Sequence, residues 1–242
     1  MTLTGWDQST FTYDGTTYPT YRRGVGPGVV IVHEVPGITP NVEIFANEVV
    51  DAGFTVVMPS LFGTPGEGHT TGNVAKSVLK ICISHEFVAM RAGRTSPVTR
   101  WLGALADELH KELGGPGVGA LGMCFSGGFA LGMMATGPVV APVLSQPSMP
   151  FPVSPTLRAD LNLSPADLAT VKAKVAAGCP VLGLRFTGDP AVGTRFDTYR
   201  REFGDGFLAV ELPGKGHSVL TEQRDEPSVQ RVLEFFRQQL KG

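Results

Sequence analysis

Apolar residues occur along this chain in short runs that alternate with segments of mixed polarity. Six runs are rich in branched or small apolar residues and are bounded by glycine, proline or polar residues. Such uninterrupted runs are typical of strands that are buried on both faces of a parallel sheet. The expected strands are 28–34, 54–59, 118–123, 139–144, 181–186 and 207–212.

The segments between these runs carry the start and stop signals of helices. Thr39 is a candidate N-cap, Pro40 suits the first helical position, and Gly53 follows the end of that segment. Ser96 and Gly114 bracket a second segment in the same way, around a stripe of apolar residues. The expected helices lie within 39–53, 96–115, 125–135, 164–177, 190–203 and 227–240.

Strand and helix alternate nearly throughout, which predicts an α/β fold with a mostly parallel sheet covered by helices on both faces. Ahead of the first parallel strand, residues 11–21 alternate aromatic and polar positions around Asp14-Gly15, a dipeptide that favours a two-residue hairpin turn. An antiparallel hairpin is therefore expected at the N-terminus. A chain of 242 residues suits one large α/β core, so we expect a single domain over residues 1–242.

Charge and cysteine content narrow the class of protein. The chain has 20 basic and 22 acidic residues, so it has no positive excess to neutralise phosphates, and we expect no nucleic-acid partner. Its three cysteines are far apart and form no cluster at zinc spacing, which indicates a reducing compartment and no metal site. Residues 1–15 lack the basic and apolar regions of a secretory signal, so a cytoplasmic location is expected.

One uncharged stretch, residues 113–157, is long enough to cross a bilayer. Glycines and prolines crowd it, however, and a buried strand, turn and helix inside an α/β core explain the same composition. We therefore expect no membrane span. Within this stretch, residues 117–122 spell G-x-G-x-x-G, but these glycines precede and occupy a strand rather than follow it, so no dinucleotide cofactor is expected.

The segment LGMCFSGG, residues 121–128, has the form of a nucleophile elbow, a sharp turn between a strand and a helix. The residues two positions before and after the nucleophile must be small, and this condition holds whether the turn is centred on Cys124 or on Ser126. The strand at 118–123 favours Cys124, because the turn should follow the strand directly. A buried free cysteine with a packing role is the alternative.

Two residues downstream can complete a catalytic triad. In α/β-hydrolases the nucleophile, the acid and the histidine follow one another in this order along the chain. Asp189 ends one expected strand and His217 follows the next, so both the order and the topology are present. Taken alone, Asp189 is also a typical turn residue before proline, and His217 a typical surface histidine.

This combination of motifs resembles the dienelactone hydrolase family, which has an α/β-hydrolase fold, a G-x-C-x-G-G elbow and a glutamate after the first central strand. The resemblance extends over most of the chain, from VIVHEVPG through GMCFSGG and TGD to GHS. It implies that Cys124 is the nucleophile, with Asp189 and His217 as its partners. It also implies that Glu34 contacts the cysteine in the resting enzyme, and that the backbone N–H groups of Val35 and Phe125 form the oxyanion hole.

The chain departs from this family pattern at two points. Serine stands at position 126, where the family usually has glycine, and Thr221 stands four residues after His217, where well-studied members have a substrate-binding arginine. This second difference bears on the substrate, because that arginine binds a carboxylate. Arg91 and Arg94 precede an expected helix N-terminus and are candidates to take over this role, although both also suit a solvated surface.

The sequence thus predicts a carboxylic ester hydrolase of the dienelactone hydrolase type that cleaves a small-molecule ester or lactone without a metal or organic cofactor. Two alternatives remain open. One is a serine esterase or thioesterase that uses Ser126. The other is a noncatalytic small-molecule binder or thiol sensor on the same fold, because a fold alone does not fix a function. The physiological substrate and the oligomeric state do not follow from the sequence.

Overall fold

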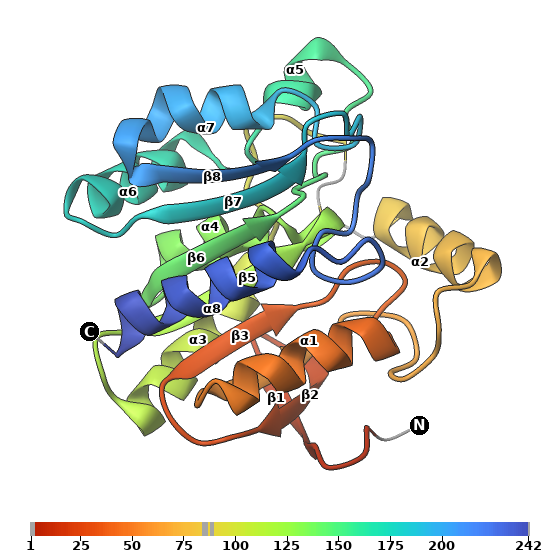
Figure 1. The fold of residues 1–242 in the computed structure, drawn as a ribbon, viewed down its shortest axis with the longest axis vertical. Coiled ribbons are helices and arrows are strands. Elements are labelled where there is room, and N and C mark those ends of the chain that lie inside the picture. Colours follow the sequence, from red (N-terminus) through yellow and green to blue (C-terminus); the bar gives the residue numbers. More distant parts are fainter. Residues whose placement is uncertain (1–2, 84–86, 88–89, 242) are drawn as a thin grey trace.

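The computed structural model describes residues 3–83, 87 and 90–241, and Figure 1 shows their arrangement. An eight-stranded sheet runs through the molecule in the order β1-β2-β4-β3-β5-β6-β7-β8. Its strands are β1 (Asp7–Tyr13), β2 (Thr16–Arg23), β3 (Gly28–Val32), β4 (Thr55–Pro59), β5 (Val118–Met123), β6 (Val139–Ser145), β7 (Val181–Phe186) and β8 (Phe207–Leu212). All pairs from β4 to β8 are parallel, whereas β2 pairs antiparallel with both β1 and β4.

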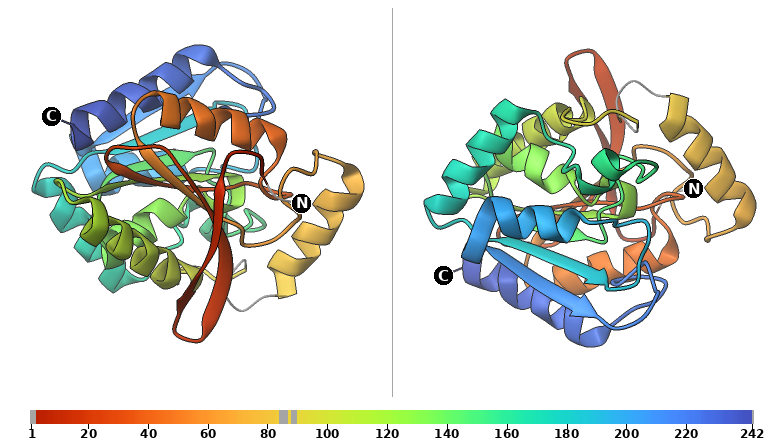
Figure 2. Two further views of the ribbon diagram at one scale, coloured as in Figure 1. Left: turned by 90° about the horizontal axis from the view of Figure 1, so that it is seen from below. Right: turned by 90° about the horizontal axis from the view of Figure 1, so that it is seen from above.

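The helices form two layers around this sheet, as the views in Figure 2 show. They are α1 (Pro40–Asp51), α2 (Thr71–Ile83), α3 (Val98–Leu113), α4 (Phe129–Thr136), α5 (Pro155–Ala159), α6 (Pro165–Ala176), α7 (Arg195–Phe203) and α8 (Glu226–Leu240). One apolar layer lies between the sheet and α1 and α8, and a second lies under α3, α4, α6 and α7. Helix α2 stands apart from both layers, beside the carboxyl ends of the parallel strands (Figures 1 and 2).

The predicted α/β architecture is confirmed, including the hairpin that opens the fold. Asp14 and Gly15 take positive φ angles of 48° and 75° in the turn between β1 and β2, as the hairpin prediction requires. Trp101 of α3 fixes this hairpin to the body of the protein, because its indole N–H donates to the carbonyl of Thr16 at 3.1 Å and its ring meets Phe11 edge-on. None of the described helices is long and apolar enough to span a membrane.

Several predicted boundaries need correction. Ser96 does not cap α3 with its side chain, because its hydroxyl donates to the carbonyl of Phe87 and to Asn162 instead. Helix α4 begins at Phe129 rather than at residue 125, because residues 124–126 form a separate 3₁₀ turn. Helix α7 begins at Arg195 rather than near 190, after a loop that serves the site. Helices α2 and α5 were not predicted.

Candidate active site

Cys124 occupies a strained turn directly after β5. Its φ angle is 56°, in the left-handed region that non-glycine residues rarely adopt. Two glycines make the turn possible, because their backbones approach other backbone atoms too closely for a side chain. A Cβ on Gly122 would lie 2.0 Å from the carbonyl oxygen of Ser126, and one on Gly127 would lie 2.5 Å from the Cα of Pro147. The turn therefore has the geometry of a nucleophile elbow with Cys124 at its tip.

The hydroxyl of Ser126 is enclosed behind this turn. Its oxygen accepts the N–H of Met123 at 2.9 Å and lies 3.0 Å from the carbonyl oxygens of Val32 and His33 and of Met123 itself. The residue is fully buried. This hydroxyl joins the ends of β3 and β5, so its place at the elbow is structural. Ser126 is therefore a poor candidate nucleophile, in contrast to the half-buried Cys124.

Asp189 and His217 meet at the carboxyl ends of β7 and β8. His217 Nδ1 lies 2.7 Å from Asp189 Oδ2, and the other carboxylate oxygen accepts the N–H of Ala191 at 2.9 Å. The Cys124 thiol is near enough to the imidazole to help raise the pKa of His217. Because Nδ1 faces the carboxylate, Nε2 is the ring nitrogen left for the sulfur. The three side chains thus lie in the sequence thiol, imidazole and carboxylate.

The surroundings of His217 favour its protonated form. Burial alone would lower the pKa of His217, but hydrogen bonds to Asp189 and Cys124 and the negative charge of these groups outweigh it, so the pKa is raised above its usual value. An imidazolium between two acidic partners stabilises a thiolate beside it. The arrangement can therefore both generate a sulfur nucleophile and supply a proton to a leaving group.

Glu34 lies at the end of β3 with 3% of its surface exposed. Its Oε2 accepts hydrogen bonds from Ser218 Oγ at 2.9 Å and Gln146 Nε2 at 3.2 Å, and its Oε1 accepts one from Thr221 Oγ1. In the described part of the chain, no hydrogen bond joins this carboxylate to Cys124. Burial raises the pKa of Glu34, although the hydrogen bonds from Thr221 and Ser218 oppose this shift. Thr221 therefore serves Glu34 at the position where the resemblance leads one to look for a substrate-binding arginine.

The two backbone N–H groups predicted for the oxyanion hole are those of Val35 and Phe125. Among the described residues, no protein acceptor takes the N–H of Val35 or that of Phe125. The turn that carries Val35 is held by His33. Its Nε2 accepts the N–H of Leu61 at 3.1 Å, so Nδ1 carries the proton and donates to the carbonyl of Glu34 at 2.8 Å.

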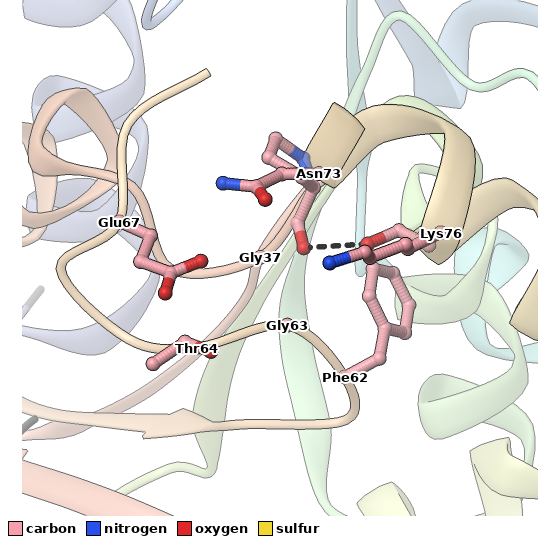
Figure 3. Close-up of a pocket in the computed structure, with 9 residues that line it drawn as sticks. Gly37, Phe62, Gly63, Thr64, Glu67, Asn73 and Lys76 are labelled. Atoms are coloured by element: carbon pink, nitrogen blue, oxygen red, sulfur yellow. Dashed lines mark hydrogen bonds between the residues drawn. The ribbon is translucent and has the colours of Figure 1, made fainter. Parts of the chain in front are cut away.

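A cavity of about 250 Å³ adjoins this turn, between it and α2 (Figure 3). Pro36 and Gly37 form one wall, and the hydroxyl of Ser77 on α2 donates to the carbonyl of Pro36 at 2.9 Å. Figure 3 shows the side chains of Glu67 and Lys76 entering the cavity from opposite sides. Neither side chain forms a hydrogen bond or ion pair within the described residues. The cavity is thus lined by one ammonium and one carboxylate group without a partner among the described residues.

The predicted substrate arginines lie elsewhere. Arg91 and Arg94 are both exposed, and neither lines the cavity beside the Val35 turn. Their role in substrate binding stays a prediction. Sequence reasoning missed Gln146, Ser218 and Lys76. Ser218 follows the predicted histidine directly and could have been found by proximity, whereas Gln146 and Lys76 carry no motif that marks them.

A family model now places this arrangement among known proteins. The model of the dienelactone hydrolase family matches residues 16–177, more than half of the chain and including the elbow and Glu34. This chain belongs to the dienelactone hydrolase family. Because a lactone is a cyclic ester, this dienelactone hydrolase family member is an ester-cleaving hydrolase. No curated protein matches its sequence significantly.

Several solved structures have the same fold as this dienelactone hydrolase family member. A dienelactone hydrolase from Anabaena variabilis has a TM-score of 0.68 at 17% identity, with 97% of this chain and 98% of that chain covered. A dienelactone hydrolase-like promiscuous phosphotriesterase from metagenomic libraries has a TM-score of 0.66 at 17% identity, with 97% and 98% covered. A cold-adapted esterase from an Arctic intertidal metagenomic library has a TM-score of 0.62 at 17% identity, with 96% and 93% covered. These similarities establish the α/β-hydrolase fold.

Proposed function

We propose that the protein hydrolyses a small-molecule ester or lactone. The reaction uses a triad of Cys124, His217 and Asp189 and proceeds through a thioester acyl-enzyme. The observation that carries the proposal is the hydrogen bond between His217 Nδ1 and Asp189 Oδ2, at 2.7 Å, on an imidazole whose pKa the Cys124 thiol also helps to raise. The enclosure of Ser126 supports sulfur rather than oxygen as the attacking atom. The chemistry requires neither a metal nor an organic cofactor.

Transfer of the thiol proton to Nε2 of His217 gives the thiolate–imidazolium pair that the surroundings of His217 favour, and in the first half-reaction this sulfur attacks the carbonyl carbon of the ester. The negative charge that develops on the carbonyl oxygen is held by the N–H groups of Val35 and Phe125. When the tetrahedral intermediate collapses, the carbon–oxygen bond to the alcohol breaks and His217 returns the proton to the leaving oxygen. A thioester on Cys124 remains.

In the second half-reaction His217 takes a proton from water as the water attacks the thioester carbon. The same two N–H groups stabilise the second oxyanion. Collapse of this intermediate breaks the carbon–sulfur bond, releases the carboxylic acid and returns the proton on Nε2 to the sulfur of Cys124. Asp189 keeps its hydrogen bond to Nδ1 throughout, which fixes the orientation of the ring and stabilises the imidazolium. In both half-reactions His217 thus first accepts a proton, from the thiol or from water, and then donates it to the leaving group.

Glu34 enters the proposal as the second buried carboxylate of the site. The family resemblance assigns it a contact with the resting thiol, which requires the carboxylate to leave the donors that it has in this structure. Such a gate would disfavour the thiolate by repulsion of like charges. Under the gate hypothesis, Glu34→Gln increases the rate at which iodoacetamide alkylates Cys124. An unchanged rate removes the gate and leaves Glu34 a structural role.

The cavity beside Val35 is the proposed place for the part of the substrate that does not react. It adjoins the proposed oxyanion turn through Pro36 and presents Lys76 and Glu67 to a bound molecule (Figure 3). The esterase and phosphotriesterase among the structural neighbours are consistent with a small-molecule ester as substrate. Arg91 and Arg94 remain candidates for an acidic substrate, provided that one of them turns toward this cavity.

Paired substitutions at the two candidate nucleophiles test the proposal. Cys124→Ala should reduce ester hydrolysis by about a thousandfold or more, because only one group attacks. Ser126→Ala serves as the matched control. It should lower stability, because the carbonyl and amide groups around the hydroxyl lose their partner, while activity per folded molecule stays within about tenfold. The reverse pattern would assign the reaction to Ser126, and full activity in both variants would remove both residues from the mechanism.

A further inference from the structure

Gln146 has a backbone conformation that its residue type does not explain. Four described non-glycine residues take a positive φ angle, namely Asp14, Cys124, Gln146 and Asn162. Aspartate and asparagine tolerate this region, and Cys124 is the tip of the elbow. The φ angle of Gln146, 33°, has no such explanation. Strain of this kind persists only where surrounding contacts impose it, and it is frequent at functional sites.

The backbone contacts that impose this conformation connect two parts of the proposed triad. Gln146 directly follows β6, and its N–H donates to the carbonyl of Leu184 in β7, the strand that leads to Asp189, at 2.8 Å. Its carbonyl accepts a hydrogen bond from Ser148 Oγ at 2.9 Å. The N–H of Ser148 in turn donates to the carbonyl of Cys124 at 2.9 Å. The segment thus connects the elbow at Cys124 with β7, the strand that precedes Asp189.

The side chain of Gln146 extends the same connection to Glu34. It is fully buried, its Oε1 accepts a hydrogen bond from Ser145 Oγ, and its Nε2 donates to Glu34 Oε2 at 3.2 Å. The hydrogen bond from Ser145 fixes which end of the amide faces Glu34. That carboxylate also binds two hydroxyls of the loop that begins at His217, those of Ser218 and Thr221. Gln146 therefore reaches the histidine loop through a single intermediate residue.

We propose that Gln146 is a positioning residue for ester hydrolysis that acts through Glu34. By fixing the Glu34 carboxylate, it holds the adjoining turn with the N–H of Val35 and the loop with His217 in one arrangement. The left-handed backbone is what allows one residue to brace the elbow with its main chain and reach Glu34 with its side chain. This inference rests on the proposed function, because it concerns how the groups of that reaction are placed.

Asparagine at position 146 separates the two contributions of this residue. It tolerates a positive φ angle better than glutamine does, but its side chain is one methylene shorter and does not span the distance to Glu34. Gln146→Asn relieves backbone strain but removes a buried hydrogen bond, so the two effects oppose each other and the thermal midpoint should change by only a few degrees. Even so, kcat for a neutral activated ester should fall about tenfold or more while KM changes less than twofold, as expected when an interaction serves the transition state.

Thr221 supplies an independent test at the other end of the connection. Thr221→Val keeps the shape of the side chain but removes the hydroxyl that Glu34 accepts, so it should reproduce the loss of kcat. Thr221→Ser restores the hydroxyl and should recover most of that loss. If Gln146→Asn fails to fold, this pair still decides the inference. Equal activity in Thr221→Val and Thr221→Ser would then overturn it.

The alkylation of Cys124 by iodoacetamide, measured against pH, provides a readout that a purely structural role does not move. Loosening the His217 loop weakens the contact of the imidazolium with the thiol, so in Gln146→Asn and Thr221→Val the alkylation profile should shift to higher pH. A wild-type profile, or a kcat within twofold of wild type, overturns the inference. Cys124→Ala is assayed alongside: retention of hydrolysis there refutes the proposed function itself, whereas its loss together with an unshifted profile refutes only the role of Gln146.

Discussion

The two sides of the candidate active site differ in whether their polar side chains have hydrogen-bond partners. On the floor, which runs from Cys124 through Glu34 to His217, the carboxylates of Glu34 and Asp189 accept hydrogen bonds from several donors. On the wall, formed by the cavity residues beside α2, the side chains of Lys76 and Glu67 have no hydrogen bond or ion pair to another described residue. The fold thus fixes the groups proposed for the chemistry and leaves those proposed for substrate contact free to vary.

The largest effect is expected on the floor, at Asp189. Asp189→Asn keeps the size of the side chain but removes the negative charge and allows the other imidazole tautomer, so kcat should fall by about 10³-fold to 10⁴-fold. Adding Cys124→Ala should cause little further loss, because members of a triad act as one unit. Steady-state kinetics of the single and double variants measure this. Losses that multiply would show that the two residues serve separate sites.

A large effect on stability is expected at Arg195, which forms hydrogen bonds with the loop that contains Asp189. This guanidinium is fully buried and donates all of its N–H groups to backbone carbonyls of the Asp189 loop and of the segment 150–160. The acceptors belong to Pro150, Leu157, Asp160, Ala191 and Val192. Arg195→Met removes all five of these donated hydrogen bonds from the protein interior, so the free energy of unfolding should decrease by about 3–5 kcal/mol.

Urea denaturation measures this decrease, with Arg195→Lys as the control. Lysine keeps the charge and three donors on a flexible chain, so its loss should be smaller. A decrease below about 1 kcal/mol in Arg195→Met would mean that other contacts hold the Asp189 loop.

The raised pKa of His217 predicts a pH dependence of stability. Below the unfolded value of about 6.5 both states are protonated and the stabilisation by Asp189 and Cys124 is complete. As the pH rises above that value, the unfolded state loses its proton first, so the free energy of unfolding decreases until the folded state has also lost its proton. Denaturation between about pH 6 and about pH 9 should show this decrease in wild type. The slope should flatten in Asp189→Asn, and an equal slope in both proteins would contradict the interaction.

The smallest effect is expected on the wall. Lys76→Gln should raise KM for a carboxylate-bearing ester by up to about fivefold and leave KM for its neutral methyl ester unchanged, because an exposed charge pair contributes at most about 1 kcal/mol. Arg91→Gln and Arg94→Gln provide the comparison with the sequence-based prediction. A selective loss in an arginine variant instead of Lys76→Gln would transfer the substrate contact to that arginine.

The contrast between floor and wall also explains what the sequence could predict. The elbow depends on local requirements, namely a buried strand that ends at Met123 and small residues around Cys124, and both can be read from the sequence. The order of Asp189 and His217 after successive strands follows from the alternation of the elements. These signals predicted the α/β architecture and the positions of Cys124, Asp189 and His217 at one edge of the sheet.

The remaining parts depend on contacts between distant segments. Ser126 is disfavoured as the nucleophile because its hydroxyl forms hydrogen bonds to the carbonyl groups of Val32 and His33, which lie more than ninety positions earlier in the chain. The partners of Glu34 come from the ends of β6 and β8, and no motif marks Gln146 as one of them. Helix α2 begins with Thr71 and Gly72, which gives no clear start signal, so the wall with Lys76 was not predicted.

The central claim is that the sulfur of Cys124 attacks the substrate, and trapping the acyl-enzyme tests it most directly. Wild-type protein is mixed briefly with an activated neutral ester, quenched in acid, digested and analysed by peptide mass spectrometry, with Cys124→Ala as the control. The account predicts one acyl group on Cys124 in the wild type and none in the control. An acyl group on Ser126, or equal labelling in Cys124→Ala, would contradict it.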